Sequence, residues 1–409
     1  MVEPLQRPAR RNPLERARMP SLPAMGRSRA GMLLTQAAAE GRFALQCCQE
    51  CGAFCYPAHD VCPQCLSVNL ALQDAPTGGT VVSETTVRVP ADVYFRERAP
   101  WRIGLVKLDC GPVLVAHLHA DCQDGGRARV SLQLDKAGQG VAFARPPEDT
   151  ANMADDRQWR EMTASPKFRR ALVTNGRTAV GQATAAALAQ AGAAVYVGVA
   201  EPWKPFAGED HLSAYEIVPL DVTDERSVRD LAGNLGGKID ILVNTGEFVR
   251  PGGLLGRHGT TTIRDEIDQR YIGLVHLAQA FGPAMLARGA DGVNCAAAWV
   301  NVISVYALAN WAAFGTYSAV EAACLSLSHC LRSELRPGGV RVVNLFCGAL
   351  DTEWFQTVPP PKVTPKAVAS AIVRALENGV EDVFVGEVAN DVRQRLASNP
   401  KALERDLGA

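Results

Sequence analysis

Two C-x-x-C pairs joined by a short loop constrain the beginning of this chain more than any other feature. They lie in LQCCQECGAFCYPAHDVCPQCLS, where Cys48 and Cys51 form the first pair and Cys62 and Cys65 the second. Four thiolates at this spacing are typical of a closed tetrahedral zinc site, which stabilises a fold and leaves no coordination position for a substrate. The spacing therefore predicts a structural zinc ribbon with these four cysteines as ligands.

Three other residues in the same stretch are alternative ligands. Cys47 and Cys55 offer extra thiols and His59 offers an imidazole, but the repeated C-x-x-C spacing favours the four cysteines above over buried or redox-active cysteines. The chain has 12 cysteines in 409 residues, and those outside the cluster are scattered in apolar surroundings. This usage does not suggest a disulfide scaffold, so we expect a reducing, cytoplasmic environment.

Short runs rich in β-branched residues follow the ribbon. A short helix in GMLLTQAAAEGRF precedes it and ends near Gly41, and the runs after it are GGTVVSETTVRV, WRIGLVKLDCG, PVLVAHLHADC and ARVSLQL. Apolar and polar residues alternate within these runs, and Gly, Pro and Asp separate the runs, which indicates β-strands. Five strands that close into a barrel bury their inward faces. We therefore predict a small β-barrel of the OB type. Aromatic residues are sparse and acidic residues interrupt any basic stripe, which argues against a nucleic-acid surface.

Charge and hydropathy exclude other classes of protein. With 42 basic and 43 acidic residues, the chain has no overall electrostatic attraction to nucleic acid or anionic membranes. No window approaches about 18 uninterrupted apolar residues, so we expect no membrane span. The first 30 residues are rich in Arg and Pro and lack an apolar signal core. They predict a disordered arm, with a transit peptide or a misassigned start codon as the alternatives.

Apolar strands alternate with helices in the second half of the chain. The strands are RRALVTN, AAVYVGV, EIVPLD, IDILVNT, VNVISV, VRVVNLF and EDVFVG, and VGQATAAALAQAG is the clearest helix between them. Near-continuous apolar strands separated by helices indicate a parallel, doubly wound α/β sheet of the Rossmann type. The polar, Pro-interrupted segment before them suits an interdomain linker.

These observations predict a multidomain chain, in which a zinc ribbon and OB-type barrel precede a Rossmann domain. The predicted parts are a disordered arm at 1–30, the short helix and zinc ribbon at 31–75, the barrel at 76–147, a linker at 148–166 and the Rossmann domain at 167–409.

The ordered motifs of residues 31 to 147 resemble the acyl-CoA-associated OB-fold proteins with a rubredoxin-like zinc ribbon. The resemblance rests on CQECGAFCYPAHDVCPQC, GGTVVSETTVRVP and APWRIGLVKLDCGPVLVAHL. It implies an acyl-CoA setting in fatty acid, sterol or polyketide-type metabolism. It also implies a partner enzyme that resembles a thiolase or a lipid-transfer-type aldolase.

Residues 167 to 409 resemble the short-chain dehydrogenase/reductase superfamily. The motifs are ALVTNGRTAVG, LDVTD, DILVNT, VNVISV and, 13 residues after Ser304, YSAVEAA. The resemblance implies cofactor contacts from Thr174, Gly176, Gly181, Asp221, Val222 and Asn244. It also implies that Ser304 steadies a substrate carbonyl, that Tyr317 transfers the proton, and that the chain forms a homodimer through this domain.

The chain departs from that superfamily at several functional positions. Glu321 stands where a lysine would lower the pKa of the tyrosine, and Arg270 replaces an asparagine. Cys347 replaces a proline, and Asn175 and Ala179 stand where glycines are expected in the cofactor loop. An anion beside a phenol raises its pKa, which makes the phenol a poor acid or base. An Arg270–Glu321 pair would be either a structural salt bridge, which we favour, or a different electrostatic design.

The residues at the end of the second predicted Rossmann strand do not favour either NAD or NADP. Val199 stands where an acidic residue would bind the adenosine ribose, and Glu201 lies two residues beyond it. Lys204 or Arg177 offers positive charge for a 2′-phosphate.

Two functions remain open from the sequence. The first is an accessory or scaffold subunit that docks the partner enzyme and carries a weakly active or inactive reductase domain. The second is an NAD(P)-dependent oxidoreductase that acts on a keto- or hydroxyacyl-CoA through Ser304 and Tyr317.

Overall fold

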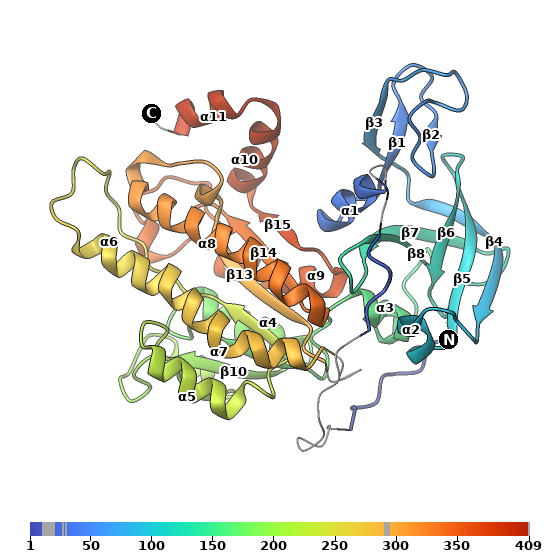
Figure 1. Ribbon diagram of the computed structural model, residues 1–409. Helices are drawn as coiled ribbons and strands as arrows, with labels where there is room; N and C mark the ends of the chain where they lie inside the picture. The colour runs from blue at the N-terminus through green and yellow to red at the C-terminus, as the bar shows by residue number, and fades with distance from the viewer. Residues whose placement is uncertain (10–20, 27, 29–30, 290–294, 408–409) are drawn as a thin grey trace. The chain divides into compact units, whose positions relative to one another are not determined.

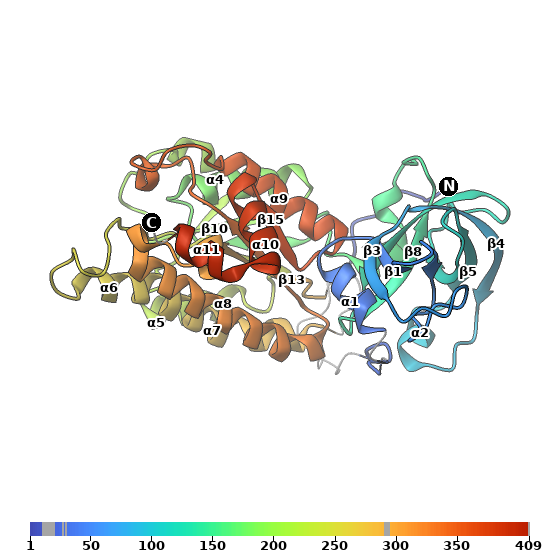
Figure 2. The same cartoon turned by 90° about the horizontal axis from the view of Figure 1, so that it is seen from above.

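The computed structural model describes residues 1–9, 21–26, 28, 31–289 and 295–407. They form two compact units, whose main parts are Ser21–Ser165 and Pro166–Leu376 (Figures 1 and 2). Part of the predicted disordered arm, at residues 10–20, 27 and 29–30, lies outside the described residues. Within the described part, no helix has both the length and the apolar character that a membrane crossing requires.

The first unit begins with a helix and a small three-stranded sheet. Helix α1 (Met32–Ala39) is followed by antiparallel strands in the order β2-β1-β3, which are β1 (Ala44–Cys48), β2 (Phe54–Cys55) and β3 (Leu70–Asp74). Ala44 and Leu45 of β1 are buried in the same apolar core as Ala37 and Ala38 of α1. The ribbon sheet and the helix are therefore packed into one body with the barrel that follows.

Five strands close into the predicted barrel in the order β4-β5-β6-β8-β7. They are β4 (Gly78–Val87), β5 (Trp101–Leu108), β6 (Val113–Leu118), β7 (Arg127–Leu134) and β8 (Gly140–Arg145). Alternate residues point inward, such as Leu114, Ala116 and Leu118 of β6. Between β4 and β5 lies the short helix α2 (Val93–Glu97), which Asp92 caps by accepting a hydrogen bond from the Tyr94 N–H.

The segment that the sequence assigned to a linker folds onto the barrel. It contains a 3-10 turn (Met153–Asp155) and helix α3 (Arg157–Met162), which Asp156 caps by accepting from the Trp159 N–H at 2.7 Å. Trp159 and Met162 are buried in a cluster with Trp101 and Phe143 of the barrel. The Gln158 side chain also exchanges two hydrogen bonds with the Arg102 backbone of β5, so apolar burial and hydrogen bonds together hold this segment on the first unit.

The second unit is built on a seven-stranded parallel sheet in the order β11-β10-β9-β12-β13-β14-β15. The strands are β9 (Arg170–Val173), β10 (Ala194–Val199), β11 (Glu216–Pro219), β12 (Ile241–Asn244), β13 (Ala298–Ser304), β14 (Arg341–Cys347) and β15 (Asp382–Val385). β9, first in sequence, lies between β10 and β12, so the order reverses there. In open α/β sheets a ligand crevice forms at such a switch point, outside the carboxyl ends of the strands.

Helices cover both faces of this sheet, with α5, α7 and α8 on one side and α4 and α9 on the other (Figures 1 and 2). A single cluster joins buried side chains of α5, α7 and α8 to Leu172, Leu242 and Trp299 of the strands. The helices are α4 (Ala179–Gln190), α5 (Glu225–Leu235), α6 (Thr261–Glu266), α7 (Gly273–Ala287), α8 (Gly315–Leu335), α9 (Pro365–Asn378), α10 (Glu387–Ser398) and α11 (Pro400–Leu407).

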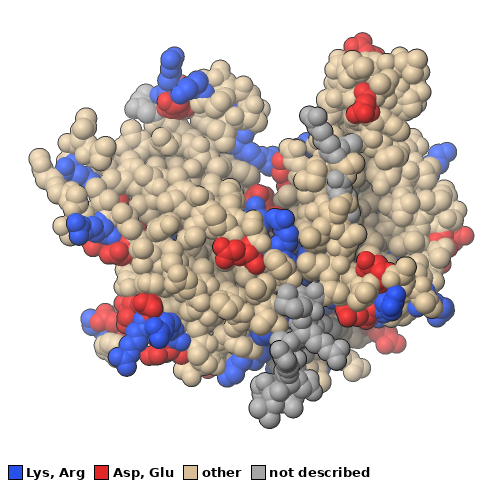
Figure 3. Space-filling view, viewed as in Figure 1, with Lys and Arg blue, Asp and Glu red and all other residues tan. Residues whose placement is uncertain are grey.

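Charged side chains of both signs are interspersed on the face of the molecule that Figure 3 shows. No continuous basic stripe is visible on that face, which agrees with the balance of 42 basic and 43 acidic residues.

Candidate metal centre and candidate active site

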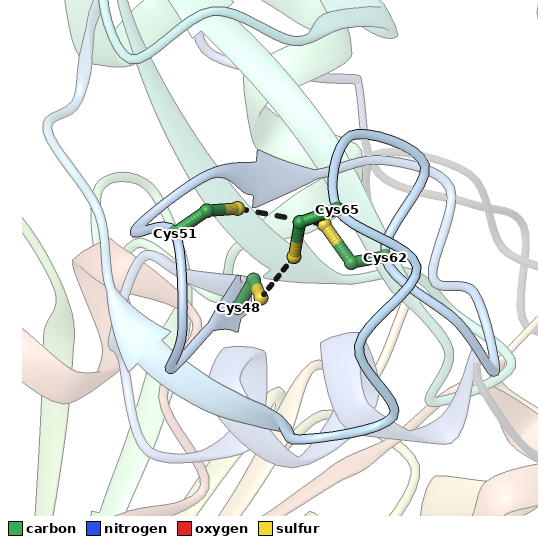
Figure 4. Close-up of side chains that lie close together, drawn as sticks. All are labelled: Cys48, Cys51, Cys62 and Cys65. Atoms are coloured by element: carbon green, nitrogen blue, oxygen red, sulfur yellow. Dashed lines mark hydrogen bonds between the residues drawn. The ribbon is translucent and has the colours of Figure 1, made fainter.

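The four cysteines of the two C-x-x-C pairs converge at one end of the ribbon (Figure 4). Cys48 is the last residue of β1 and Cys51 lies in the turn that follows, where Gly52 adopts a φ of 72° and donates its N–H to the Cys48 carbonyl. Cys62 and Cys65 form a second turn, closed by the Leu66 N–H bonding to the Cys62 carbonyl. Each pair is therefore presented by a tight, backbone-bonded turn.

The sulfur positions fit a bound metal ion. All four Sγ atoms lie within 4.8 Å of one another, with Cys48 to Cys65 at 3.5 Å and Cys51 to Cys62 at 3.6 Å. Tetrahedral zinc with Zn–S bonds of about 2.3 Å requires sulfurs about 3.8 Å apart. Backbone N–H groups of Cys65 and Gln64 bond to the Cys62 sulfur and lower the pKa of that thiol to about 6, which favours the thiolate that a metal needs. Four converging thiols suit a structural zinc ion.

The alternative ligands lie outside this cluster. The Cys47 thiol donates to the Gly52 carbonyl at 3.5 Å and the Cys55 thiol to the Ala53 carbonyl at 3.8 Å. Burial raises the pKa of both thiols. His59 is exposed, and its backbone exchanges two hydrogen bonds with the Gln46 side chain, each of 2.8 Å. The candidate metal centre is therefore the group of four that the spacing favoured.

In the second unit, Ser304 and Tyr317 line one pocket at the carboxyl edge of the sheet. Ser304 ends β13 and accepts a hydrogen bond from the Tyr306 N–H at 3.3 Å, which starts the 3-10 turn Val305–Ala307. Tyr317 is in the first turn of α8 and is 7% exposed. Cys347, the last residue of β14, lines the same pocket, and burial raises the pKa of its thiol to about 12. The two predicted catalytic side chains thus share a site.

A buried ion pair lies behind this pocket. Arg270, in a π-helical turn (Ile267–Ile272) between α6 and α7, donates from Nε to Glu321 Oε1 at 2.6 Å. The same guanidinium donates to the Val302 carbonyl at 3.0 Å and to the Gly246 carbonyl. Glu321 Oε2 accepts the Ser304 N–H at 2.7 Å. The pair is 6% and 0% exposed and ties helix α8 to the ends of β12 and β13.

The charges around Tyr317 oppose proton transfer. Burial raises the pKa of Tyr317 well above its usual value near 10, the Glu321 carboxylate raises it further, and Arg270 opposes that increase. Proton transfer is fastest when the pKa of the group is near the working pH. A raised pKa keeps the Tyr317 phenol in its protonated form.

The pocket is also narrow. Its free volume is about 20 Å³, which is roughly enough for one water molecule. Arg270, Phe355 and Leu350 are among the side chains that fill it. Glu247, which the sequence analysis did not single out, lines this pocket as well, and burial raises the pKa of its carboxyl group. The sequence could have indicated Glu247, because it lies three residues after Asn244 in the segment that follows the DILVNT motif.

The glycines of the predicted cofactor loop are required by the fold itself. A Cβ on Gly181 would lie 1.7 Å from the Asn175 carbonyl oxygen, and one on Gly176 would lie 2.4 Å from Val197. Thr178 caps α4 by accepting the Gly181 N–H at 3.0 Å, while Ala179 is exposed at the first helical position. These two glycines therefore support the strand-to-helix turn and do not by themselves indicate a nucleotide.

The other predicted cofactor contacts lie at the same edge of the sheet and are used by neighbouring groups. Thr174 donates to Asn244 Oδ1 at 3.3 Å and accepts the Thr245 N–H at 3.1 Å. Asp221, just beyond β11, accepts from the Thr223 N–H and hydroxyl at 2.9 and 2.7 Å. Val222 packs against the core that α7 shares. These residues hold the loops in place, and their roles toward a cofactor remain predictions.

The basic side chains of Arg177 and Lys204 lie beyond the end of β10. Arg177 donates to the carbonyls of Ala200, Glu201 and Lys204 at 2.8 to 3.0 Å. Lys204 pairs with the Glu201 carboxylate at 2.6 Å. Val199 is buried at the end of the strand. The arrangement provides a fixed guanidinium here, next to a carboxylate that is already neutralised by a lysine.

Family models match three consecutive parts of the chain. Residues 35–71 match "ChsH2, rubredoxin-like zinc ribbon domain", residues 72–133 match "ChsH2, C-terminal OB-fold domain", and residues 169–362 match "short chain dehydrogenase". These matches confirm the predicted order of zinc ribbon, OB barrel and Rossmann domain.

Individual relatives cover the second unit. The short-chain dehydrogenase PC-15 of Penicillium crustosum is 33% identical over 159 residues, which are 36% of this chain and 55% of that protein. The short-chain dehydrogenase ptmH of Penicillium ochrochloron is 32% identical over 191 residues, 44% of this chain and 66% of that protein. The chain therefore spans between about half and two thirds of the length of these curated relatives.

Among solved structures, a short chain dehydrogenase from Burkholderia cenocepacia in complex with NADP is 30% identical. The TM-score is 0.53, and the alignment covers 59% of this chain and 98% of that one.

Proposed function

Because the chain belongs to the short-chain dehydrogenase family through its second unit and carries ChsH2-type zinc-ribbon and OB-fold domains in its first, we propose that it is an accessory subunit of acyl-CoA metabolism. Its zinc ribbon and barrel dock a thiolase-like or aldolase-like enzyme. Its dehydrogenase domain has little or no turnover and serves as a scaffold within the complex. The four-cysteine site holds structural zinc and takes no part in chemistry.

The buried pair of Arg270 and Glu321 carries this proposal. A dehydrogenase that uses Tyr317 needs a cation beside the phenol to bring its pKa down toward neutrality. Here the Glu321 carboxylate raises the pKa of the phenol, and the Arg270 guanidinium donates its hydrogen bonds to Glu321, Val302 and Gly246. The pocket of about 20 Å³ adds support, because a nicotinamide ring needs far more room than one water.

An active oxidoreductase is the second candidate, and one observation favours it. Ser304 and Tyr317 line the same pocket, as the two groups would have to in a working site. In that case the substrate is a keto- or hydroxyacyl-CoA. NADP then fits better than NAD, since Arg177 is fixed beyond β10 and the nearby Glu201 is paired with Lys204. The NADP complex of the Burkholderia relative is consistent with this preference.

Titration of the zinc-loaded protein with NADPH and NADH, followed by nucleotide fluorescence, separates the two candidates. The accessory function predicts no saturable binding up to millimolar nucleotide. Saturation at micromolar concentration, about 8 kcal/mol of binding free energy, would overturn it and would justify assays with ketoacyl-CoA substrates. An active short-chain dehydrogenase measured in parallel controls for the sensitivity of the signal.

A homodimer through the second unit is part of the proposal. Helices α7 and α8 present a groove lined by apolar side chains, among them Val275, Leu286 and Leu327. Pairing of two copies along these helices would bury this groove. Sedimentation equilibrium of the wild-type protein and of Leu327→Asp tests it, with a dimer expected for the first and a monomer for the second.

A further inference from the structure

The first unit contains a roomy pocket that the sites above do not include. It offers about 360 Å³ of free space, within the range of small-molecule sites and far above the 20 Å³ beside Tyr317. Helix α1, the ribbon loop and strands β6 and β8 contribute its walls, with Leu34, Tyr56, Pro57, Val115, His117 and Val141 among the lining residues. All of these lie within Ser21–Ser165, so the pocket belongs to a single unit.

The pocket follows from an incomplete seam in the barrel. Strands β6 and β8 pair only at His117 with Phe143 and at Leu118 with Ala144, so the rest of β6 separates from β8. Helix α1 is fixed beside the gap, because Thr35 Oγ1 accepts the Gly140 N–H at 2.9 Å. A Cβ on Gly140 would lie 2.5 Å from the Leu34 backbone, so only glycine allows this close approach. The wall is therefore a built part of the fold.

His117 brings a polar ring nitrogen to the wall of this pocket. The Trp101 indole donates from Nε1 to His117 Nδ1 at 2.8 Å. An indole N–H donates only, so Nδ1 is the unprotonated nitrogen and the proton of the neutral ring is on Nε2. The His117 ring makes no second hydrogen bond to the described residues, and Phe95 stacks on it at 6.1 Å between centroids. Burial lowers the pKa of His117 to about 4, which keeps the ring neutral at physiological pH.

The remaining lining residues decide the chemistry of the ligand. Among the described lining residues none carries a charge, and most are aliphatic, glycine or proline. A charged group entering this space would lose its hydration without a compensating partner. We propose that this pocket binds an uncharged, mainly apolar molecule whose carbonyl oxygen accepts a hydrogen bond from His117 Nε2. This site is separate from the Ser304–Tyr317 pocket, so the proposal holds whether or not the second unit binds a nicotinamide cofactor.

Two matched probes test the chemistry on the full, zinc-loaded chain. Methyl octanoate has an apolar chain and an uncharged carbonyl, and octanoate has the same chain with a carboxylate. We expect saturable binding of the ester by calorimetry, together with a shift of the Trp101 indole N–H resonance. We expect octanoate to bind at least about tenfold more weakly, because the described lining residues include no cation. Equal affinity for the two probes, or no saturable binding of the ester, would overturn the proposal.

Variants on one strand locate the binding. Val115 and Val113 both point outward from β6 and are 54% and 45% exposed, but only Val115 is among the lining residues. Val115→Trp should abolish binding of the ester, whereas Val113→Trp should leave it unchanged. His117→Phe keeps the aromatic ring and removes the donor, and should weaken binding about fivefold. Wild-type affinity in Val115→Trp would place the ester elsewhere and refute the assignment.

Discussion

The cysteine cluster of the first unit and the Ser304–Tyr317 site of the second were both expected from short motifs, but they differ in what those motifs require. A structural metal site needs four donors at the right distance, and Cys48, Cys51, Cys62 and Cys65 supply them with sulfurs within 4.8 Å. A proton-transfer site also needs a charge environment that sets a pKa. Ser304 and Tyr317 line one pocket, but burial and the Glu321 carboxylate raise the pKa of Tyr317 while Arg270 only partly opposes them. Bringing side chains together defines a metal site more fully than it defines a proton-transfer site.

Loss of a cluster cysteine should give the largest effect. Cys62→Ser removes one of four thiolates, and zinc binding in small metal domains contributes about 10–16 kcal/mol to folding. We expect metal analysis to fall from about one zinc per chain to near zero and the ribbon to lose its protease resistance. The matched control is Cys55→Ser, a nearby buried thiol outside the cluster, which should keep its zinc. Equal zinc loss in both variants would contradict the ligand assignment.

Breaking the ion pair should have the next largest effect. Glu321→Ala leaves the Arg270 guanidinium buried without its partner, which costs about 3–5 kcal/mol in the free energy of unfolding. The double variant Arg270→Met/Glu321→Leu removes both charges and should recover most of that loss. Urea unfolding of the two variants and the wild type measures both effects. If the single variant were as stable as the wild type, the pair would have no structural role.

Reversing the charge beside Tyr317 tests whether the Arg270–Glu321 pair alone keeps the Ser304–Tyr317 site from reductase activity. Arg270→Asn/Glu321→Lys places a cation next to the phenol without a second buried cation, which should lower the pKa of Tyr317. We expect NADPH-dependent reduction of acetoacetyl-CoA to rise at least about tenfold, since acid–base catalysis contributes about 10²- to 10⁴-fold. Arg270→Asn/Glu321→Gln is the control that removes the pair without adding a cation. Equal inactivity of the two would move the defect to the cofactor loop around Asn175 and Ala179.

The smallest effect is expected for the tyrosine itself. Tyr317→Phe removes only the hydroxyl group and keeps the ring that packs near Phe314 and Phe355. In the wild-type background it should change the free energy of unfolding by about 1 kcal/mol or less and leave any residual reductase activity unchanged. A clear drop in activity would show that Tyr317 works despite Glu321.

Sequence patterns predicted the elements well where one physical rule dominates. All seven Rossmann strands lie where apolar runs were noted, because a parallel sheet buried on both faces needs continuous apolar strands. The fifth barrel strand, Gly140–Arg145, was not located in advance, and the segment around Trp159 was assigned to a linker. In that segment two apolar side chains and the Gln158 hydrogen bonds hold the packing, and none of these residues produces a periodic pattern.

The site was predictable in its members and not in its contacts. Ser304 and Tyr317 followed from motif order. An Arg270–Glu321 pair was one expectation from the sequence, but these residues are 51 apart and only the fold shows that they meet. Its formation depends on the π-helical turn at Ile267–Ile272, which no local residue preference specified. Similarly, His117 lies in an ordinary strand pattern, and only the separation of β6 from β8 exposes it to a pocket.

The Arg270–Glu321 pair also limits how this chain can evolve. A change to lysine at position 321 alone would put two cations in contact in a buried site, and a change to asparagine at position 270 alone would leave a buried carboxylate without its partner. Both one-step intermediates would fold poorly, so selection would remove them before the second substitution arose. Strong epistasis between positions 270 and 321 can thus prevent the chain from acquiring asparagine and lysine there, even if every other part of that site is intact.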